Sequence, residues 1–155
     1  MQITHIFSDI DGVLTDGTVS LDAEGNERKS ICYRDLDAVG LLRRAGIKLY
    51  FVTGEDSPLT QRIIAKFKPE GAECGAKDKG AVFAALSRRL GVSPESVCYI
   101  GDSERDIPAL QAAGLAVCPA DAMPNVLRVA QYVTAAKGGA GVLSEVAARI
   151  MEEWQ

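Results

Sequence analysis

Three aspartates stand within three residues of the ends of predicted strands. Asp9 and Asp11 bracket a single residue beyond the apolar run of residues 3–8, and Asp102 follows the apolar run of residues 97–100. Two carboxylates this close repel each other unless a cation binds between them or one of them takes up a proton. Three hard oxygen donors suit Mg²⁺, which takes few carboxylates and keeps several waters. A carboxylate can also attack phosphorus as a nucleophile, while a second one serves as acid and base.

Further polar residues follow strand ends or begin helices. Thr53-Gly54 offers a hydroxyl and an unhindered backbone N–H, which suit phosphate oxygens, and Lys79 offers a compact positive charge. Asp106 could cap a helix, or it could hold Lys79 and the waters of a metal in place. Each feature has an ordinary alternative: Asp9-Ile10-Asp11-Gly12 also suits a plain turn, Thr53-Gly54 a strand end, and Lys79 a solvated helix face. Their joint occurrence favours a site.

Alternating strands and helices are expected to bring these residues together. They predict an α/β fold, with a three-layer, doubly wound, Rossmann-like parallel sheet whose ligand site lies at the carboxyl ends of the strands. No repeat or linker divides the chain, so a single domain over residues 1–155 is expected. A β-hairpin is predicted, with strands at residues 18–21 and 28–33 around the turn at 22–26. The other strands are expected at 3–8, 47–52, 97–100, 115–118 and 132–133, and the helices at 36–45, 58–67, 77–90, 107–113, from 124, and at 142–154.

The composition narrows the classes of partner. The chain has 155 residues, of which 47% are hydrophobic and 25% charged, and its formal charge is −4. This charge gives no reason to expect nucleic acid or an anionic membrane as a partner. An anionic substrate would therefore need a metal ion or a few local cations at its site. No apolar run approaches the roughly 20 residues that span a bilayer, and the start of the chain lacks a leader pattern, so a cytoplasmic location is expected.

The cysteines and the histidine favour no other chemistry. Cys98 and Cys118 lie in apolar runs and are predicted to be buried free thiols, and the spacing of the four cysteines fits neither a zinc site nor a disulfide framework. His5 is the only histidine and stands at a predicted strand start, far from the strand ends that the candidate site residues follow. A Ser-His-Asp or Cys-His arrangement is therefore excluded, which leaves carboxylate chemistry.

The four clusters, in this order, resemble the four motifs of the haloacid dehalogenase (HAD) superfamily. The resemblance implies that Asp9 is the nucleophile and Asp11 the acid and base. It also implies that Mg²⁺ is bound by Asp9, the backbone carbonyl of Asp11, and Asp102. Dehalogenases of the superfamily lack the second aspartate, so Asp11 favours phosphoryl transfer. The matching segments are Asp9-x-Asp11-Gly12-x-x-Thr15, Thr53-Gly54, Lys79 and Gly101-Asp102-x-x-x-Asp106.

Only a hairpin and one helix separate Asp11 from Thr53, which leaves no room for a cap domain. The chain resembles the capless subgroup that contains the 3-deoxy-D-manno-octulosonate 8-phosphate phosphatases and their nine-carbon relatives. That resemblance implies a homotetramer assembled through the hairpins, in which a neighbouring subunit closes each site. It also implies that the segment beginning Lys137-Gly138 folds over the substrate. Further similar stretches are residues 9–17, Ala120-Asp121-Ala122 and Tyr132-Val133-Thr134.

Departures from the octulosonate pattern concern the substrate pocket. Those enzymes carry Arg-Asp-Gly-x-Gly where this chain has Leu36-Asp37-Ala38-Val39-Gly40, and Thr-Gly-Arg where it has Thr53-Gly54-Glu55. A glutamate at this position resembles the nine-carbon phosphatases. The arginine that those enzymes carry later, in the following helix, is displaced by one position in this chain, to Arg62. We therefore expect a Mg²⁺-dependent phosphatase acting on the 8- or 9-phosphate of a 3-deoxy-2-keto sugar acid. The residues expected to contact the sugar are Asp37, Glu55, Arg62, Lys137 and Gly138.

Two other functions are open to a chain of this pattern. Related domains fused to acylneuraminate cytidylyltransferases serve oligomerisation, and a weakly catalytic accessory domain of that kind is the main alternative. It predicts loss of the acidic residues, yet Asp9, Asp11, Asp102 and Asp106 are all present, as is Lys79. A phosphotransferase or mutase is the third reading, and the absence of a cap makes it the least favoured.

Overall fold

Six parallel strands form the centre of the computed structural model, which describes residues 2–153. Their order is β5-β4-β1-β6-β7-β8, so the chain starts in the middle of the sheet and winds towards both edges. This arrangement confirms the predicted doubly wound α/β fold. The strands are β1 (His5–Ser8), β4 (Lys48–Val52), β5 (Gly71–Glu73), β6 (Val97–Ile100), β7 (Leu115–Cys118) and β8 (Tyr132–Val133).

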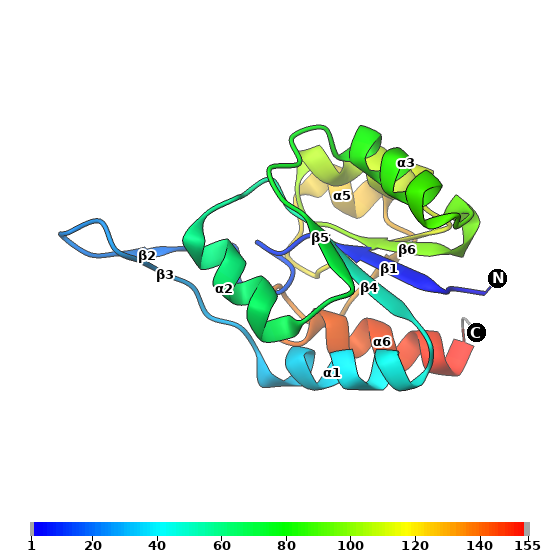
Figure 1. The fold of residues 1–155 in the computed structure, drawn as a ribbon, viewed down its shortest axis with the longest axis horizontal. Helices are drawn as coiled ribbons and strands as arrows, with labels where there is room; N and C mark the ends of the chain where they lie inside the picture. Colours follow the sequence, from blue (N-terminus) through cyan, green and yellow to red (C-terminus); the bar gives the residue numbers. More distant parts are fainter. Residues whose placement is uncertain (1, 154–155) are drawn as a thin grey trace.

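Helices cover both faces of the sheet and make the predicted three layers (Figure 1). One face carries α1 (Tyr33–Arg44), α2 (Pro58–Phe67) and α6 (Val142–Glu153). The other carries α3 (Lys79–Leu90), α4 (Ile107–Ala112) and α5 (Pro124–Val129), and two 3₁₀ turns, η1 (Pro94–Ser96) and η2 (Glu104–Asp106), precede β6 and α4. The last predicted helix was expected to include Trp154, which lies outside the described residues.

The two-residue period of the strands divides the core into two clusters. In β1, Ile6 packs under α1 and α6 while its neighbour Phe7 packs against the α3 side, and both side chains are fully buried. In β6, Ile100 and Tyr99 are divided in the same way. A sheet that is apolar on both faces must be covered on both, which is the usual state of parallel sheets. The polar residues are therefore confined to the strand ends.

A β-hairpin follows the first strand, as predicted, but it is short. Its strands β2 (Ser20–Leu21) and β3 (Glu27–Arg28) have two residues each, and it projects from the body of the molecule (Figure 1). The carboxylate of Asp22 accepts hydrogen bonds from the backbone N–H groups of Glu24 and Asn26, at 2.9 and 2.8 Å, which fixes the turn. The second strand was predicted to reach Tyr33, but that residue begins α1 instead.

Helix α3 and strand β5 differ from the prediction for local reasons. The helix predicted from residue 77 begins at Lys79, because the side chain of Asp78 caps it by accepting the N–H of Ala81 at 3.0 Å. Strand β5 was not predicted, since Gly71-Ala72-Glu73 is half-buried and lacks an apolar pattern. It pairs with β4 at the edge of the sheet.

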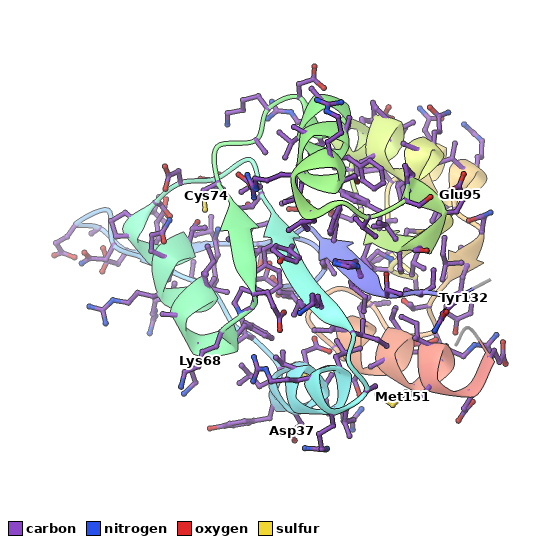
Figure 2. The ribbon with its side chains drawn as sticks, turned by 45° about the vertical axis from the view of Figure 1, so that its right-hand side comes forward. Asp37, Lys68, Cys74, Glu95, Tyr132 and Met151 are labelled. Carbon is purple, nitrogen blue, oxygen red and sulfur yellow. The ribbon has the colours of Figure 1, made fainter. Side chains whose placement is uncertain are left out.

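Helix α1 carries two aspartates with opposite environments. Asp35 is fully buried and accepts the backbone N–H of Ser144, in the first turn of α6, at 3.0 Å. Burial raises the pKa of Asp35, although backbone hydrogen bonds from α6 oppose the shift. Asp37 is exposed and points away from the sheet (Figure 2). The carboxylate with a structural task is therefore Asp35, which ties α1 to α6.

Two composition-based expectations can be compared with the fold. Cys98 and Cys118 are buried free thiols, as predicted, and Cys32 and Cys74 are half-buried and unpaired. Among the helices of residues 2–153, none has the length and apolar character required to cross a membrane.

Replacing Asp35 with alanine should lower the free energy of unfolding by about 2 kcal/mol, because the start of α6 loses a buried carboxyl hydrogen-bond acceptor. Urea unfolding of the D35A variant measures this loss. The matched control is D37A, the same change two residues later on the exposed side of α1, which should shift stability by less than about 0.5 kcal/mol. Equal losses in the two variants would contradict the assigned role of Asp35.

Candidate active site

The loop after β1 places Asp9 and Asp11 at the carboxyl edge of the sheet. The backbone N–H of Asp9 continues the sheet by donating to the carbonyl of Ile100 at 2.9 Å. The loop then turns tightly, with Gly12 at a φ of +87°. A Cβ at Gly12 would lie 1.8 Å from Oδ2 of Asp102. Glycine is therefore required twice over, for its backbone angle and for the close passage of the loop over Asp102.

Lys79 bridges two buried carboxylates. Its Nζ lies 3.0 Å from Oδ2 of Asp9 and 2.9 Å from Oδ1 of Asp106, and all three side chains are almost completely buried. Burial alone would lower the pKa of Lys79, but the two carboxylates outweigh it and raise the pKa. The first turn of α3 thus places a permanent positive charge beside Asp9. Lys79 therefore lies among buried carboxylates and not on a solvated helix face.

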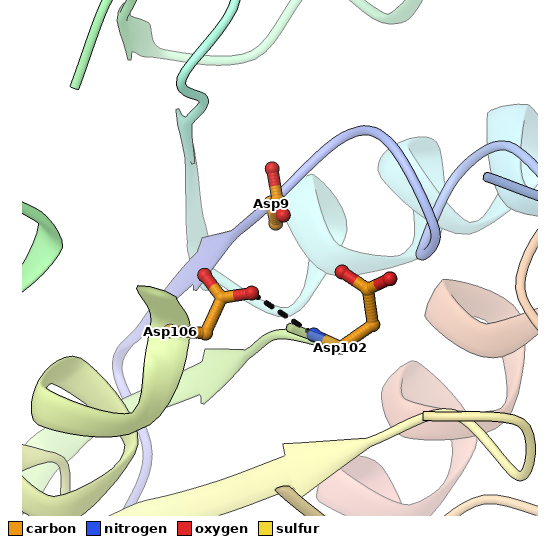
Figure 3. A group of neighbouring side chains, drawn as sticks. All are labelled: Asp9, Asp102 and Asp106. Carbon is orange, nitrogen blue, oxygen red and sulfur yellow. Dashed lines mark hydrogen bonds between the residues drawn. The ribbon is translucent and has the colours of Figure 1, made fainter. Parts of the chain in front are cut away.

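Asp106 uses both of its oxygens within the protein. Oδ1 accepts from Lys79 and from the hydroxyl of Tyr99 at 2.7 Å. Oδ2 accepts the backbone N–H of Asp102 at 3.0 Å (Figure 3) and that of Ser103 at 3.1 Å. Burial raises the pKa of Tyr99 well above its usual value, so its hydroxyl stays protonated and donates. Asp106 therefore orients Lys79 and the Asp102 loop, and its own oxygens are already satisfied.

Asp102, in contrast to Asp106, has a carboxylate oxygen without a hydrogen-bond partner among the described residues. This oxygen, Oδ1, is buried, which is costly for a carboxylate oxygen that has no partner. Burial and the nearby Asp106 raise the pKa of Asp102 to about 6. Burial, Asp106 and Asp102 likewise raise the pKa of Asp9 well above its usual value, against the pull of Lys79.

These features fit a hard divalent cation. Carboxylate oxygens of Asp9, Asp102 and Asp106 lie within 4.8 Å of one another. Because Asp106 is saturated by protein donors, Asp9 and Asp102 are the side chains with capacity for a metal. A cation there would satisfy the unpartnered oxygen of Asp102 and would oppose the burial and the repulsion that raise both pKa values.

The site opens into a cavity of about 250 Å³. Thr53 and Gly54 follow β4 on one side of it, and Thr53 is buried, with its hydroxyl accepting the N–H of Glu55 at 3.3 Å. The structure thus brings together all four sequence clusters, together with Glu55. The lining residues are Asp9, Asp11, Gly17, Thr53, Gly54, Glu55, Lys77, Lys79, Asp102, Ser103 and Arg105.

Three cations at this site were not anticipated from the sequence. Lys77 and Arg105 line the cavity, and Lys29 reaches Asp11 from the hairpin at 2.9 Å. Lys77 and Arg105 each stand within two residues of a motif residue, a proximity that could have indicated them. Lys29 carried no such signal, since the fold of the hairpin alone determines where it lies.

Four of the five expected sugar contacts are not at the cavity. Asp37 and Arg62 lie exposed on α1 and α2, and Lys137 is exposed in the loop before α6. Gly138 packs against the loop after β1, where a Cβ on it would lie 2.1 Å from the carbonyl oxygen of Gly12. The segment that begins at Lys137 therefore packs against the loop after β1.

Comparisons with known proteins agree with this geometry. A family model described as haloacid dehalogenase-like hydrolase matches residues 27–114. The 3-deoxy-D-manno-octulosonate 8-phosphate phosphatase of Haemophilus influenzae is 34% identical over 97% of this chain and 84% of its own length. The phosphatase of that name from Moraxella catarrhalis, solved with magnesium, phosphate and KDO, has a TM-score of 0.92 at 29% identity, over 97% of this chain and 86% of that one. A hydrolase structure from Legionella pneumophila has a TM-score of 0.93 at 32% identity, over 97% and 82% of the two chains.

Divalent-cation binding should weaken by about tenfold or more between pH 7.5 and pH 5, because Asp102, with a pKa of about 6, must lose its proton to bind a metal. Isothermal titration with Mg²⁺ at the two pH values measures the change. A Kd that is independent of pH over this range would contradict the assignment.

The same shift predicts the pH dependence of stability without metal. A raised carboxyl pKa favours the folded state at low pH, so stability falls as the pH rises from the unfolded value of about 4 through the folded value of about 6. Added Mg²⁺ should therefore raise Tm more at pH 7.5 than at pH 5, and D102N should remove this difference.

Proposed function

The chain belongs to the haloacid dehalogenase-like hydrolase family and is a phosphoric monoester hydrolase; we propose that it hydrolyses the phosphate monoester of a 3-deoxy-2-keto sugar acid through a phosphorylated Asp9. One observation carries the proposal. A buried ammonium and an unsatisfied carboxylate oxygen stand beside Asp9 at the floor of a cavity that also holds further cations. Hydrolysis of an anionic ester needs this combination of nucleophile and local positive charge.

Mg²⁺ is the cofactor that suits this donor set. Asp9 and Asp102 would hold it, together with the backbone carbonyl of Asp11 that the family resemblance implies. When bound, the ion neutralises charge on the transferred phosphoryl group and draws it towards Asp9. Lys79 adds a fixed positive charge 3.0 Å from Oδ2 of Asp9.

The chain's own residues perform two successive displacements. In the first, a carboxylate oxygen of Asp9 forms a bond to phosphorus while the bond from phosphorus to the substrate oxygen breaks, and Asp11 gives its proton to the departing alcohol. In the second, a water loses a proton to Asp11 and attacks phosphorus, the bond to Asp9 breaks, and inorganic phosphate leaves. Asp9 ends as a carboxylate and Asp11 as an acid, so the cycle closes.

Two cations at the mouth of the cavity support a substrate with a second negative charge. Nζ of Lys77 and Nη1 of Arg105 both lie 3.9 Å from the point where a Cβ on Gly54 would stand. Lys77 donates to the carbonyl of Gly54 at 2.8 Å, and neither cation forms an ion pair with an acidic side chain of residues 2–153. The carboxylate of a sugar acid is the group that such a pair would bind.

Glu55 gives the cavity a mixed character. It stands where the octulosonate enzymes carry arginine, and a carboxylate binds hydroxyl groups and repels a carboxylate. We therefore assign Glu55 to the hydroxylated part of the sugar and the Lys77–Arg105 pair to its acid group. The length of the sugar acid, eight or nine carbons, is open to direct comparison of the two phosphates.

A homotetramer assembled through the hairpins is also part of the proposal. The hairpin projects from the body and exposes Val19 and Leu21, which are 47% and 67% exposed. Exposed apolar side chains on and beside the first strand of a projecting hairpin favour contact with another subunit. Such a contact would also help to exclude water from a site that has no cap domain.

Replacing Asp9 with asparagine should abolish Mg²⁺-dependent phosphate release, a loss of at least about 10³-fold, because the nucleophile is gone while the shape of the site remains. Phosphate release from a panel of phosphate monoesters measures it. The matched control E152Q makes the same carboxylate-to-amide change on the exposed side of α6 and should keep wild-type activity. Wild-type protein that releases no phosphate from any ester of the panel would overturn the proposal.

Replacing Lys77 and Arg105 together with methionine should lower kcat/KM for 3-deoxy-D-manno-octulosonate 8-phosphate by about 10- to 100-fold, since two charged hydrogen-bond donors to its carboxylate are lost. Activity on a neutral hexose 6-phosphate should change less than about threefold. The control R44M removes an exposed charge on α1 and should alter neither. Equal losses on both substrates would show that the two cations do not recognise the acid group. A parallel assay of the wild-type protein with the nine-carbon sugar acid phosphate shows which chain length it prefers.

A further inference from the structure

Lys29 connects the hairpin to the candidate acid and base. It follows β3 directly, and its Nζ lies 2.9 Å from Oδ1 of Asp11. Its side chain is only 10% exposed, whereas the hairpin residues from Thr18 to Arg28 are all exposed. Lys29 thus turns inward from an element that otherwise faces solvent.

The second contact to Asp11 falls on the same oxygen. The hydroxyl of Thr15 lies 3.3 Å from Oδ1 of Asp11 and is itself held by the backbone N–H groups of Gly12 and Gly17, at 3.3 and 3.2 Å. No hydrogen bond from residues 2–153 reaches the other oxygen, Oδ2. One carboxylate oxygen is therefore anchored, and the other is available to a reacting group in the cavity that Asp11 lines.

We propose that Lys29 is a positioning residue for proton transfer by Asp11, so that the seating of the hairpin determines how well the leaving group is protonated. This inference rests on the proposed function, because it requires Asp11 to act as acid and base. Proton transfer is efficient only when donor and acceptor are held within hydrogen-bond reach in the right orientation. Thr15 alone, at 3.3 Å, holds the carboxylate weakly, while the charged contact to Lys29 is short.

A purely structural role is the competing explanation, in which the ion pair only fastens the hairpin to the body. Such pairs contribute little to stability when they are near the surface, and Asp11 is 29% exposed. The two explanations differ in what they predict for leaving groups. An alkyl phosphate needs a proton on its departing oxygen, whereas p-nitrophenyl phosphate releases a stabilised anion that needs none. A fastening role would affect both esters equally.

The test is the K29M variant, assayed for kcat/KM with a sugar phosphate and with p-nitrophenyl phosphate. This parameter reports the steps up to departure of the leaving group, so it isolates the acid function of Asp11. We expect a loss of about 10- to 100-fold for the sugar phosphate and less than about threefold for the nitrophenyl ester. K29R, which keeps the charge, should recover most of the lost activity. R28M, which removes the neighbouring exposed charge of the hairpin, should leave both values unchanged.

Two results would overturn the inference: an equal loss on both esters, or no loss on either. If K29M does not fold, as judged by its thermal melt, K29Q keeps a polar side chain without the charge and should show the same selective loss. Failure of the inference is distinguishable from failure of the proposed function. In the first case the wild-type protein hydrolyses both esters and D9N neither, while in the second the wild-type protein hydrolyses neither.

Discussion

The sharing of one ammonium by two buried carboxylates is the interaction on which the site depends. Each of the three groups would be unfavourable in the interior alone, since burying an uncompensated charge costs several kcal/mol. Lys79 offsets the charge of Asp9 and Asp106 only if β1, α3 and η2 keep their relative positions. The fold keeps these positions, because Asp9 follows β1, α3 follows β5 and η2 follows β6, and these parallel strands end at the same edge of one sheet.

Asp106 extends this constraint to the metal-binding side. By accepting the N–H groups of Asp102 and Ser103 it fixes the loop in which Asp102 keeps an unsatisfied oxygen. The protein therefore holds a carboxylate ready for a cation at the cost of a raised pKa in its absence. The cations Lys29, Lys77, Lys79 and Arg105 gather around the acidic centre. A chain with a net charge of −4 thus places several cations among the carboxylates of the site where an anionic ester must bind.

The sequence predicted the parts of the site that the topology of the sheet determines. Asp9, Thr53 and Asp102 follow buried strands, and parallel strands must bring their carboxyl ends to one edge. Lys29 and Lys77 escaped prediction because loop geometry, and not strand or helix period, directs their side chains. The octulosonate-type motif was matched to Leu36-Asp37, but the aspartate with buried contacts on α1 is Asp35, two residues earlier. The two aspartates differ only in burial, and the weakly apolar sequence at the start of that helix does not indicate which of them is buried.

The central claim is that Asp9 carries the phosphoryl group, and the D11N variant tests it most directly. This variant should still accept phosphate from p-nitrophenyl phosphate with Mg²⁺, because that leaving group needs no acid, but it should lose the phosphate slowly for want of a base. Borohydride would then reduce the phosphorylated residue at position 9 to homoserine, and peptide mass spectrometry would detect the product. That conversion at position 9 is the predicted result. A phosphorylated residue elsewhere, or steady turnover by the wild-type protein with no modification at position 9 in D11N, would contradict the account.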